Sequence, residues 1–198
     1  MYTENEKANR LNSQSGSRTF NMVLTAMFAA LIAVASWISV PLPFTPVPIN
    51  LATLAVSLTG ALLGYKYGTF SVLVYLLLGA FGVPVFAGFT GGLGHIAGPT
   101  GGYLVGYLTS AFICGLVIEL SGRNENKWWV TAIAALLGTA SCYILGTIWF
   151  MVLTHNTLAA SLSMCVIPFL PGDALKITAT VLIVAAAKPV LDRMRDNG

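Results

Sequence analysis

Six long apolar stretches, separated by short polar or Pro- and Gly-rich segments, make up most of this chain. They cover residues 20–40, 49–63, 69–82, 103–120, 128–153 and 171–191. About 18 or more apolar residues in a row are typical of a membrane-spanning helix, and the second and third stretches are short by that standard. The pattern predicts an all-α integral membrane protein with six transmembrane helices.

The predicted domain organisation follows from the same pattern. Residues 1–19 are polar and are expected to form a flexible cytoplasmic N-terminal tail. Residues 20–191 are expected to form a single six-helix transmembrane domain, and residues 192–198 a cytoplasmic C-terminal tail. The first apolar stretch exceeds the roughly 7–15 apolar residues of a signal peptide, so we interpret it as a helix that stays in the membrane.

The segments between the predicted helices differ in kind. Residues 41–48 contain four prolines. Because proline lacks a backbone N–H group, this segment is predicted to be extended and polyproline-like. Residues 64–68 and 121–127 are predicted to be short turns, and residues 154–170 a loop with room for a short interfacial helix.

Glycine is concentrated in one connection. Nine of the twenty glycines fall within residues 82–106, which is too many for a helix, while the segment is too apolar for a solvated linker. Irregular backbone at membrane depth is tolerated only where it is buried in protein or lines a cavity. This segment is therefore predicted to be a lid or re-entrant loop.

The composition supports a membrane location and excludes some functions. Of 198 residues, 56% are hydrophobic and only 9% are charged, whereas soluble domains carry roughly a quarter. There is no basic stripe with interleaved aromatic residues, so nucleic-acid binding is not expected. The three cysteines lie in apolar surroundings without CxxC spacing, which implies neither a disulfide nor a metal site.

The basic residues indicate the orientation. Nine of the ten Lys and Arg residues fall in the N-terminal tail, the two short turns and the C-terminal end, and the three remaining loops contain none. By the positive-inside rule both termini are cytoplasmic. The tenth cation, Lys176, stands alone on the extracellular half. The long Pro- and Gly-rich loops share that half, which predicts a ligand pocket on the extracellular side beneath them.

Asp173 and Lys176 are the main candidates for function. Residues three apart share a helix face, and charges inside a membrane segment mark a functional site by default. Asp173 suits the positive end of the helix dipole, whereas Lys176 is opposed by it and needs an anionic partner. One interpretation is an internal ion pair. We favour a ligand carboxylate on Lys176, with Asp173 accepting from N–H groups at the opposite end of the ligand, because buried ion pairs seldom add stability.

Other candidates are individually weaker. Gly92 and Gly98 allow backbone to approach a ligand closely, and Thr90 offers a hydroxyl group. Asn50 lies at the outer end of the predicted helix 49–63 and Tyr143 in the outer half of the helix 128–153, and for both, pocket lining and helix–helix bonding are equally good interpretations. Phe89 is one of several aromatic residues able to wall an apolar pocket. His95 and His155 are not assigned to the site.

Motifs for catalysis are missing from the sequence. It contains no HExxH, no GxSxG and no GxxxxGK[ST] phosphate loop. We therefore do not expect an enzyme, and energy for transport would have to come from a partner or a gradient. The alternative of an integral membrane enzyme would use Asp173 and Lys176 as acid and base.

Alanines recur at four-residue spacing on the first helix. Ala26 pairs with Ala30, and Ala29 with Ala33. Small residues at this spacing let two helices approach closely. They either pack the first helix internally or form a docking face for another membrane protein.

Taken together, these motifs resemble the signature of the biotin-specific substrate-capture subunits (S components) of energy-coupling-factor (ECF) transporters. The similar segments are Gly91-Gly92, residues 98–104 (Gly-Pro-Thr-Gly-Gly-Tyr-Leu), and Pro171-Gly172-Asp173 with Lys176. The Pro-rich segment ending in Val47-Pro48-Ile49-Asn50-Leu51 is also similar. The resemblance covers roughly residues 20–190, with His95 standing where an apolar residue is expected.

The resemblance implies a multi-pass subunit of the prokaryotic plasma membrane that binds biotin from outside, without a cofactor. A membrane coupling (T) subunit and two ATP-binding-cassette ATPases would supply energy. Lys176 would bind the carboxylate of biotin and Asp173 its ureido N–H groups, while the glycine-loop amides, Asn50 or Tyr143 would bind its ureido oxygen. The four alanines would match the helix-1 docking motif. The alternative within this architecture is another small carboxylated vitamin.

Overall fold

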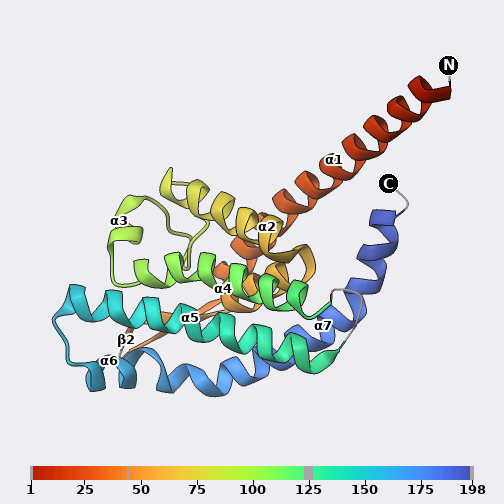
Figure 1. The fold of residues 1–198 in the computed structure, drawn as a ribbon. Helices are drawn as coiled ribbons and strands as arrows, with labels where there is room; N and C mark the ends of the chain where they lie inside the picture. The colour runs from red at the N-terminus through yellow and green to blue at the C-terminus, as the bar shows by residue number, and fades with distance from the viewer. Residues whose placement is uncertain (1, 44, 123–126, 197–198) are drawn as a thin grey trace.

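The computed structural model shows a bundle of long helices with a small two-stranded sheet (Figure 1). It describes the backbone of residues 2–43, 45–122 and 127–196, and the side chains of residues 18–43, 45–122 and 127–194. Arg123 and Glu125 of the predicted polar turn lie outside the described residues.

The helices largely follow the predicted apolar stretches. Their bounds are α1 Tyr2–Trp37, α2 Ala52–Ala80, α3 Leu93–Ala97, α4 Gly101–Leu120, α5 Trp128–Thr154, α6 Leu158–Cys165 and α7 Leu170–Asp196, with a short 3-10 turn at Ile167–Phe169. Helix α1 starts at Tyr2, so the segment predicted to be a flexible tail is helical. Within the described residues, five segments are long and apolar enough to cross a membrane: Arg18–Trp37, Ala52–Ala80, Gly101–Leu120, Trp128–Thr154 and Leu158–Met194.

The loop predicted at residues 154–170 contains a short helix, as its length allowed. Helix α6 begins after Thr157, whose hydroxyl oxygen accepts a hydrogen bond from the backbone N–H of Ala160 at 3.4 Å. This satisfies one of the N–H groups that a helix start leaves without a partner.

A reversal at Gly64 explains why five spans are found where six were predicted. Gly64 has φ 81° and ψ 177°, a conformation that only glycine adopts readily. A Cβ placed on Gly68 would lie 3.0 Å from the Cα of Gly60, whereas eight residues of straight helix span about 12 Å. Helix α2 is therefore a hairpin of two short helical arms, and the predicted turn at residues 64–68 is its tip.

The Pro-rich segment forms two antiparallel strands, β1 Ser39–Leu42 and β2 Thr45–Asn50. The prediction of extended backbone was right, but the polyproline-like form was wrong. Val40 pairs with Ile49, and prolines occupy the positions next to both. Because alternate residues of a strand face away from its partner, proline at those positions removes no N–H needed for pairing.

Glycines allow the central helices to pack closely. Helix α4 lies between α2 and α5 (Figure 1). A Cβ on Gly60 of α2 would lie 2.6 Å from the carbonyl oxygen of Ala111, and a Cβ on Gly106 of α4 would lie 2.9 Å from Cys142 of α5. Small residues at such crossings are typical of helix packing in membranes.

The buried core falls into two clusters along the bundle. One contains Leu24, Leu62, Val130 and Val184, together with the partly buried Leu191. The other contains Ile32, Val47, Phe86, Tyr103 and Phe169. The first helix of the chain starts, and the last helix ends, at the same end of the molecule, while α3, α6 and the strands lie at the opposite end (Figure 1).

Candidate functional site

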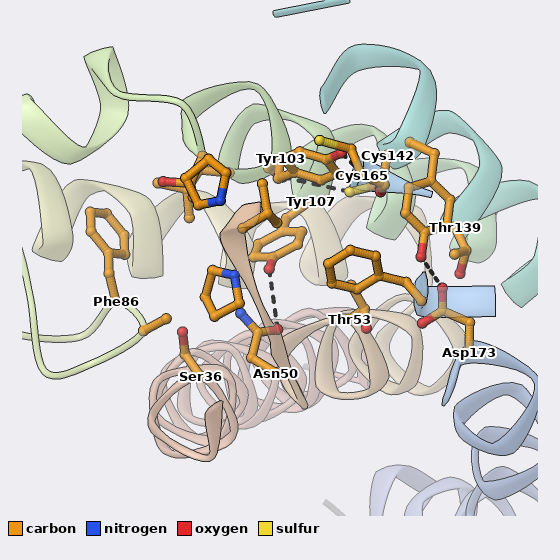
Figure 2. A pocket seen from close by; sticks show the side chains of 18 of the residues that line it. Ser36, Asn50, Thr53, Phe86, Tyr103, Tyr107, Thr139, Cys142, Cys165 and Asp173 are labelled. Carbon is orange, nitrogen blue, oxygen red and sulfur yellow. Dashed lines mark hydrogen bonds between the residues drawn. The ribbon is translucent and has the colours of Figure 1, made fainter. Parts of the chain in front are cut away.

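A cavity of about 210 Å³ opens at the end of the bundle that carries the strands and α3. Side chains from β2, α2, α3, α4, α5 and α7 line it (Figure 2). Its polar lining residues are Ser36, Asn50, Thr53, Thr90, His95, Thr100, Tyr103, Tyr107, Thr139, Tyr143, Asp173 and Lys176.

One end of the cavity holds a hydrogen-bonded cluster around Asp173. Lys176 Nζ donates to Asp173 Oδ1 at 3.1 Å, and the Tyr143 hydroxyl donates to Asp173 Oδ2. Lys176 Nζ also donates to Thr53 Oγ1 at 3.1 Å. The side chains of Lys176 and Asp173 are only 12% and 8% exposed. Three helices thus hold a buried ion pair whose charges cancel.

The geometry of this cluster follows from the start of α7. Asp173 lies in the first turn, where the free N–H groups and the helix dipole favour an anion. One turn later Lys176 extends from the same face and reaches the carboxylate, as the i, i+3 spacing requires. The carboxylate is therefore the anionic partner that Lys176 was predicted to need.

Weaker polar groups occupy the rest of the cavity. Asn50 Oδ1 accepts from the Ala52 backbone N–H at 3.1 Å and from the Tyr107 hydroxyl at 3.5 Å. The Tyr75 hydroxyl donates to Ser36 Oγ at 3.1 Å. Ser36 and Phe86 lie across the cavity from Asp173 and Thr139, with Asn50 between the two sides (Figure 2). The cavity is therefore elongated, with the ion pair at one side only.

Aromatic and apolar side chains complete the walls. Tyr103 meets Tyr143 edge to face, with ring centroids 6.4 Å apart, and its hydroxyl donates to the Cys165 carbonyl oxygen at 3.2 Å. Phe86, Leu104 and Phe169 contribute apolar surface. The described part of the chain has no group of three or more His, Cys, Asp or Glu residues able to hold a metal. The site is thus an apolar pocket with a few polar groups, the usual form of a small-molecule site.

The structure brings together five of the eight residues that were predicted to contact ligand. Asp173, Lys176, Tyr143, Asn50 and Thr90 all line the cavity. Asp173 and Lys176 are in contact with each other in this structure. Their predicted binding of opposite ends of a ligand stays a prediction.

Gly92, Gly98 and Phe89 do not line this cavity. The Gly92 N–H donates to the Gly79 carbonyl oxygen at 2.6 Å, and the Gly98 N–H to that of His95 at 3.3 Å. Both amides are therefore occupied within the protein. Phe89 stacks on Trp37 with ring centroids 5.0 Å apart and lines a separate outer hollow.

Sequence reasoning missed Thr53 and His95. Thr53 is the second residue of α2, where a hydroxyl has no distinguishing pattern, and only the tertiary fold brings it to Lys176. His95 lies on α3, inside the glycine-rich segment, and was not assigned to the site. Its departure from an otherwise apolar segment was the available signal.

The four alanines of α1 divide into two pairs with different surroundings. Ala29 and Ala33 are 3% and 7% exposed and belong to the core around the cavity. Ala26 and Ala30 are exposed on the outer face of α1. The rotation of α1 thus turns Ala29 and Ala33 inward in this structure, and the predicted docking role of the four alanines stays a prediction.

Comparisons with known proteins agree with this architecture. The sequence model described as "BioY family" matches residues 6–193. A biotin transporter BioY from Thermotoga maritima is 39% identical over 167 residues, which cover 84% of this chain and 95% of that protein. A biotin transporter BioY from Rhodobacter capsulatus is 38% identical over 174 residues, covering 82% of this chain and 90% of that protein.

A solved structure has the same fold. It is a crystal structure of the S-component for biotin from an ECF-type ABC transporter. The two chains superpose with a TM-score of 0.82 at 32% sequence identity, over 88% of this chain and 93% of the solved one.

Proposed function

The chain belongs to the BioY family, and we propose that it binds biotin in the cavity beside Asp173 and Lys176 as the substrate-specific subunit of an ECF-type importer. It is a multi-pass membrane protein of prokaryotes and has a transport function rather than an enzymatic one. The proposal places it in the plasma membrane and includes no cofactor.

The observation that carries the proposal is the buried cluster of Asp173, Lys176, Tyr143 and Thr53 at one side of an apolar cavity. Biotin has a ureido group with two N–H donors and one carbonyl acceptor, fused to an apolar thiophane ring. A carboxylate that accepts and an ammonium that donates match such a group. The aromatic and aliphatic walls suit the ring and the alkyl chain.

We further propose a topology of six membrane segments with both termini in the cytoplasm and the cavity facing outward. The two arms of α2 count as separate segments in this arrangement. It is supported by the reversal at Gly64, and by the start of α1 and the end of α7, which lie at the end of the molecule opposite the strands and α3 (Figure 1). The basic residues concentrated in the termini and short turns support the same orientation.

The proposed partners are a membrane coupling subunit and two ATP-binding-cassette ATPases. Support comes from the solved relative, which is the S-component of an ECF-type ABC transporter, and from the lack of a phosphate-binding loop in this sequence. In the described part of α1, Ala26 and Ala30 are exposed small residues that a partner helix could approach closely.

A calorimetric titration of the detergent-purified chain with biotin and with lipoate tests the function. Lipoate has the same five-carbon carboxylate chain but carries a dithiolane ring without a ureido group. Biotin should bind at one site per chain, and lipoate should bind at least about a hundredfold more weakly, because unpaired polar groups in the site penalise the wrong ligand. Tighter binding of lipoate would instead indicate another carboxylated ligand.

A further inference from the structure

The described residues that line the cavity include one Asp, one Lys and one His: Asp173, Lys176 and His95. Asp173 and Lys176 form the ion pair at one side. His95 is therefore the basic side chain among these lining residues that is not part of that pair. The position of His95 therefore bears on where in the cavity the protein binds the anionic group of a ligand.

His95 lies at the far side of the cavity from the ion pair. Its imidazole meets the ring of Phe86 edge to face, with centroids 6.4 Å apart. Phe86 lies across the cavity from Asp173 (Figure 2). His95 is exposed, whereas Asp173 is 6% exposed. The cavity thus has a deep side with cancelled charges and an open side with a basic residue.

Charge balance decides what the deep side accepts. A ligand carboxylate placed there would join Asp173, so two anions would share a single buried cation. A buried charge without a partner is strongly unfavourable. The neutral ureido group adds no charge, and it can donate to the free lone pairs of Asp173 while accepting from the third N–H of Lys176.

The open side of the cavity suits the ligand carboxylate, because a charge there is not fully buried. A carboxylate at the cavity mouth keeps part of its hydration, so its desolvation costs little. An imidazole offers an N–H donor in either charge state, and a protonated one adds an opposite charge.

We propose that His95 binds the carboxylate of the ligand at the cavity mouth and that Asp173 and Lys176 together bind the ureido ring. The proposal rests on the proposed function and reverses the sequence-based expectation that Lys176 receives the carboxylate. It makes His95 the residue that distinguishes an acid from its neutral ester.

The test compares biotin with biotin methyl ester on five full-length proteins purified in detergent. Wild type should bind the acid more tightly than the ester, on the order of fivefold, the scale of a partly solvated ion pair. His95→Leu should bring the two affinities together by weakening only the acid. His95→Lys should retain the preference, and His155→Asn serves as the control.

His155 is a matched control because it is the second histidine of the chain, is exposed and does not line the cavity. Its left-handed backbone, with φ 55°, accepts asparagine without strain. Lys176→Gln tests the other half of the proposal, the binding of the ureido ring. It should weaken the acid and the ester by the same factor, because the ureido ring is common to both.

The results distinguish a failure of the proposed role of His95 from a failure of the proposed biotin function. If wild type binds neither compound, the biotin function itself fails. If biotin binds but acid and ester bind equally, or His95→Leu leaves the preference unchanged, the role of His95 is wrong while the function stands. If Lys176→Gln loses the preference for the acid over the ester, Lys176 and not His95 binds the carboxylate.

Discussion

Lys176 and Asp173 lie one turn apart on α7, with Nζ and Oδ1 separated by 3.1 Å. Asp173 is buried, and the Lys176 side chain is only 12% exposed. The lysine is therefore neutralised by the protein before any ligand arrives. In the proposed function, the two residues therefore act as a single donor–acceptor unit and not as receptors for two separate ligand groups.

The first prediction concerns stability. Lys176→Met leaves the Asp173 carboxylate buried without its cation, which costs about 3–5 kcal/mol in comparable buried pairs. Lys176→Met combined with Asp173→Asn removes both charges and should be less destabilising than the single change. Thermal unfolding in detergent measures the difference. A double variant that unfolds at or below the temperature of Lys176→Met would contradict the pairing.

The second prediction concerns affinity. Asp173→Asn removes the charged acceptor and should weaken biotin binding by about 1.5–3 kcal/mol, the scale for hydrogen bonds to charged groups. Asp192→Asn, on the same helix but outside the cavity, is the matched control and should leave affinity unchanged. Equilibrium titration gives both values. An unchanged dissociation constant in Asp173→Asn would refute its contact with ligand.

The third prediction separates the two alanine pairs of α1. Ala29→Trp forces a large side chain into a core position that is 3% exposed and should destabilise the protein by about 1–3 kcal/mol or more. Ala26→Trp adds the same bulk on the exposed face and should leave stability and biotin binding intact. Thermal unfolding and titration of both variants provide the measurement. Equal effects on stability would mean that α1 has a different rotation.

Ala26→Trp also tests the proposed partner surface. In co-purification with the coupling subunit, it should reduce assembly while the isolated variant still binds biotin. Normal assembly would indicate that the partner contacts another face of the chain.

The fourth prediction concerns the reversal in α2. Gly64 has φ 81°, so Gly64→Ala should destabilise the protein by about 1–3 kcal/mol through backbone strain. Gly172→Ala is the matched control, since a Cβ there meets nothing within 4 Å and alanine favours the helix. Denaturant unfolding of the two variants gives the comparison. A neutral effect of Gly64→Ala would contradict the hairpin geometry.

The fifth prediction concerns access to the cavity. Phe89 stacks on Trp37, and the Trp37 indole N–H donates to the Pro84 carbonyl oxygen at 2.9 Å. These contacts hold the segment whose Phe86, Ala87 and Thr90 line the cavity. Phe89→Ala should raise association and dissociation rates together, on the order of three- to tenfold for the loss of one aromatic pair.

Rapid-filtration measurements with labelled biotin give both rates. Leu93→Ala removes an equally exposed apolar side chain that does not line the cavity, and it should leave the rates unchanged. A change in dissociation alone would show that Phe89 stabilises the bound state and does not control access.

The membrane helices could be predicted because their signal is local. Apolar length and the positions of basic residues do not depend on tertiary contacts, and helix ends at Leu120 and Trp128 agree with the predicted ones. The turn at Gly64 was also visible, although it joins two arms of one helix. Pairing of β1 with β2 was not predictable from proline content, since it depends on which face of each strand the prolines occupy.

The site was partly predictable for a similar reason. Charges within an apolar stretch identify Asp173 and Lys176 without any structure. By contrast, the burial of Ala29 depends on the rotation of α1, which packing decides. The position of His95 depends on the path of a glycine-rich segment that carries no regular periodicity.

The most direct test of the account is an experimental structure of the chain with biotin bound. We expect biotin in the cavity, its ureido group within hydrogen-bond distance of both Asp173 and Lys176 and its carboxylate on the His95 side. Biotin bound elsewhere, or held in the cavity without a polar contact to Asp173 or Lys176, would contradict it.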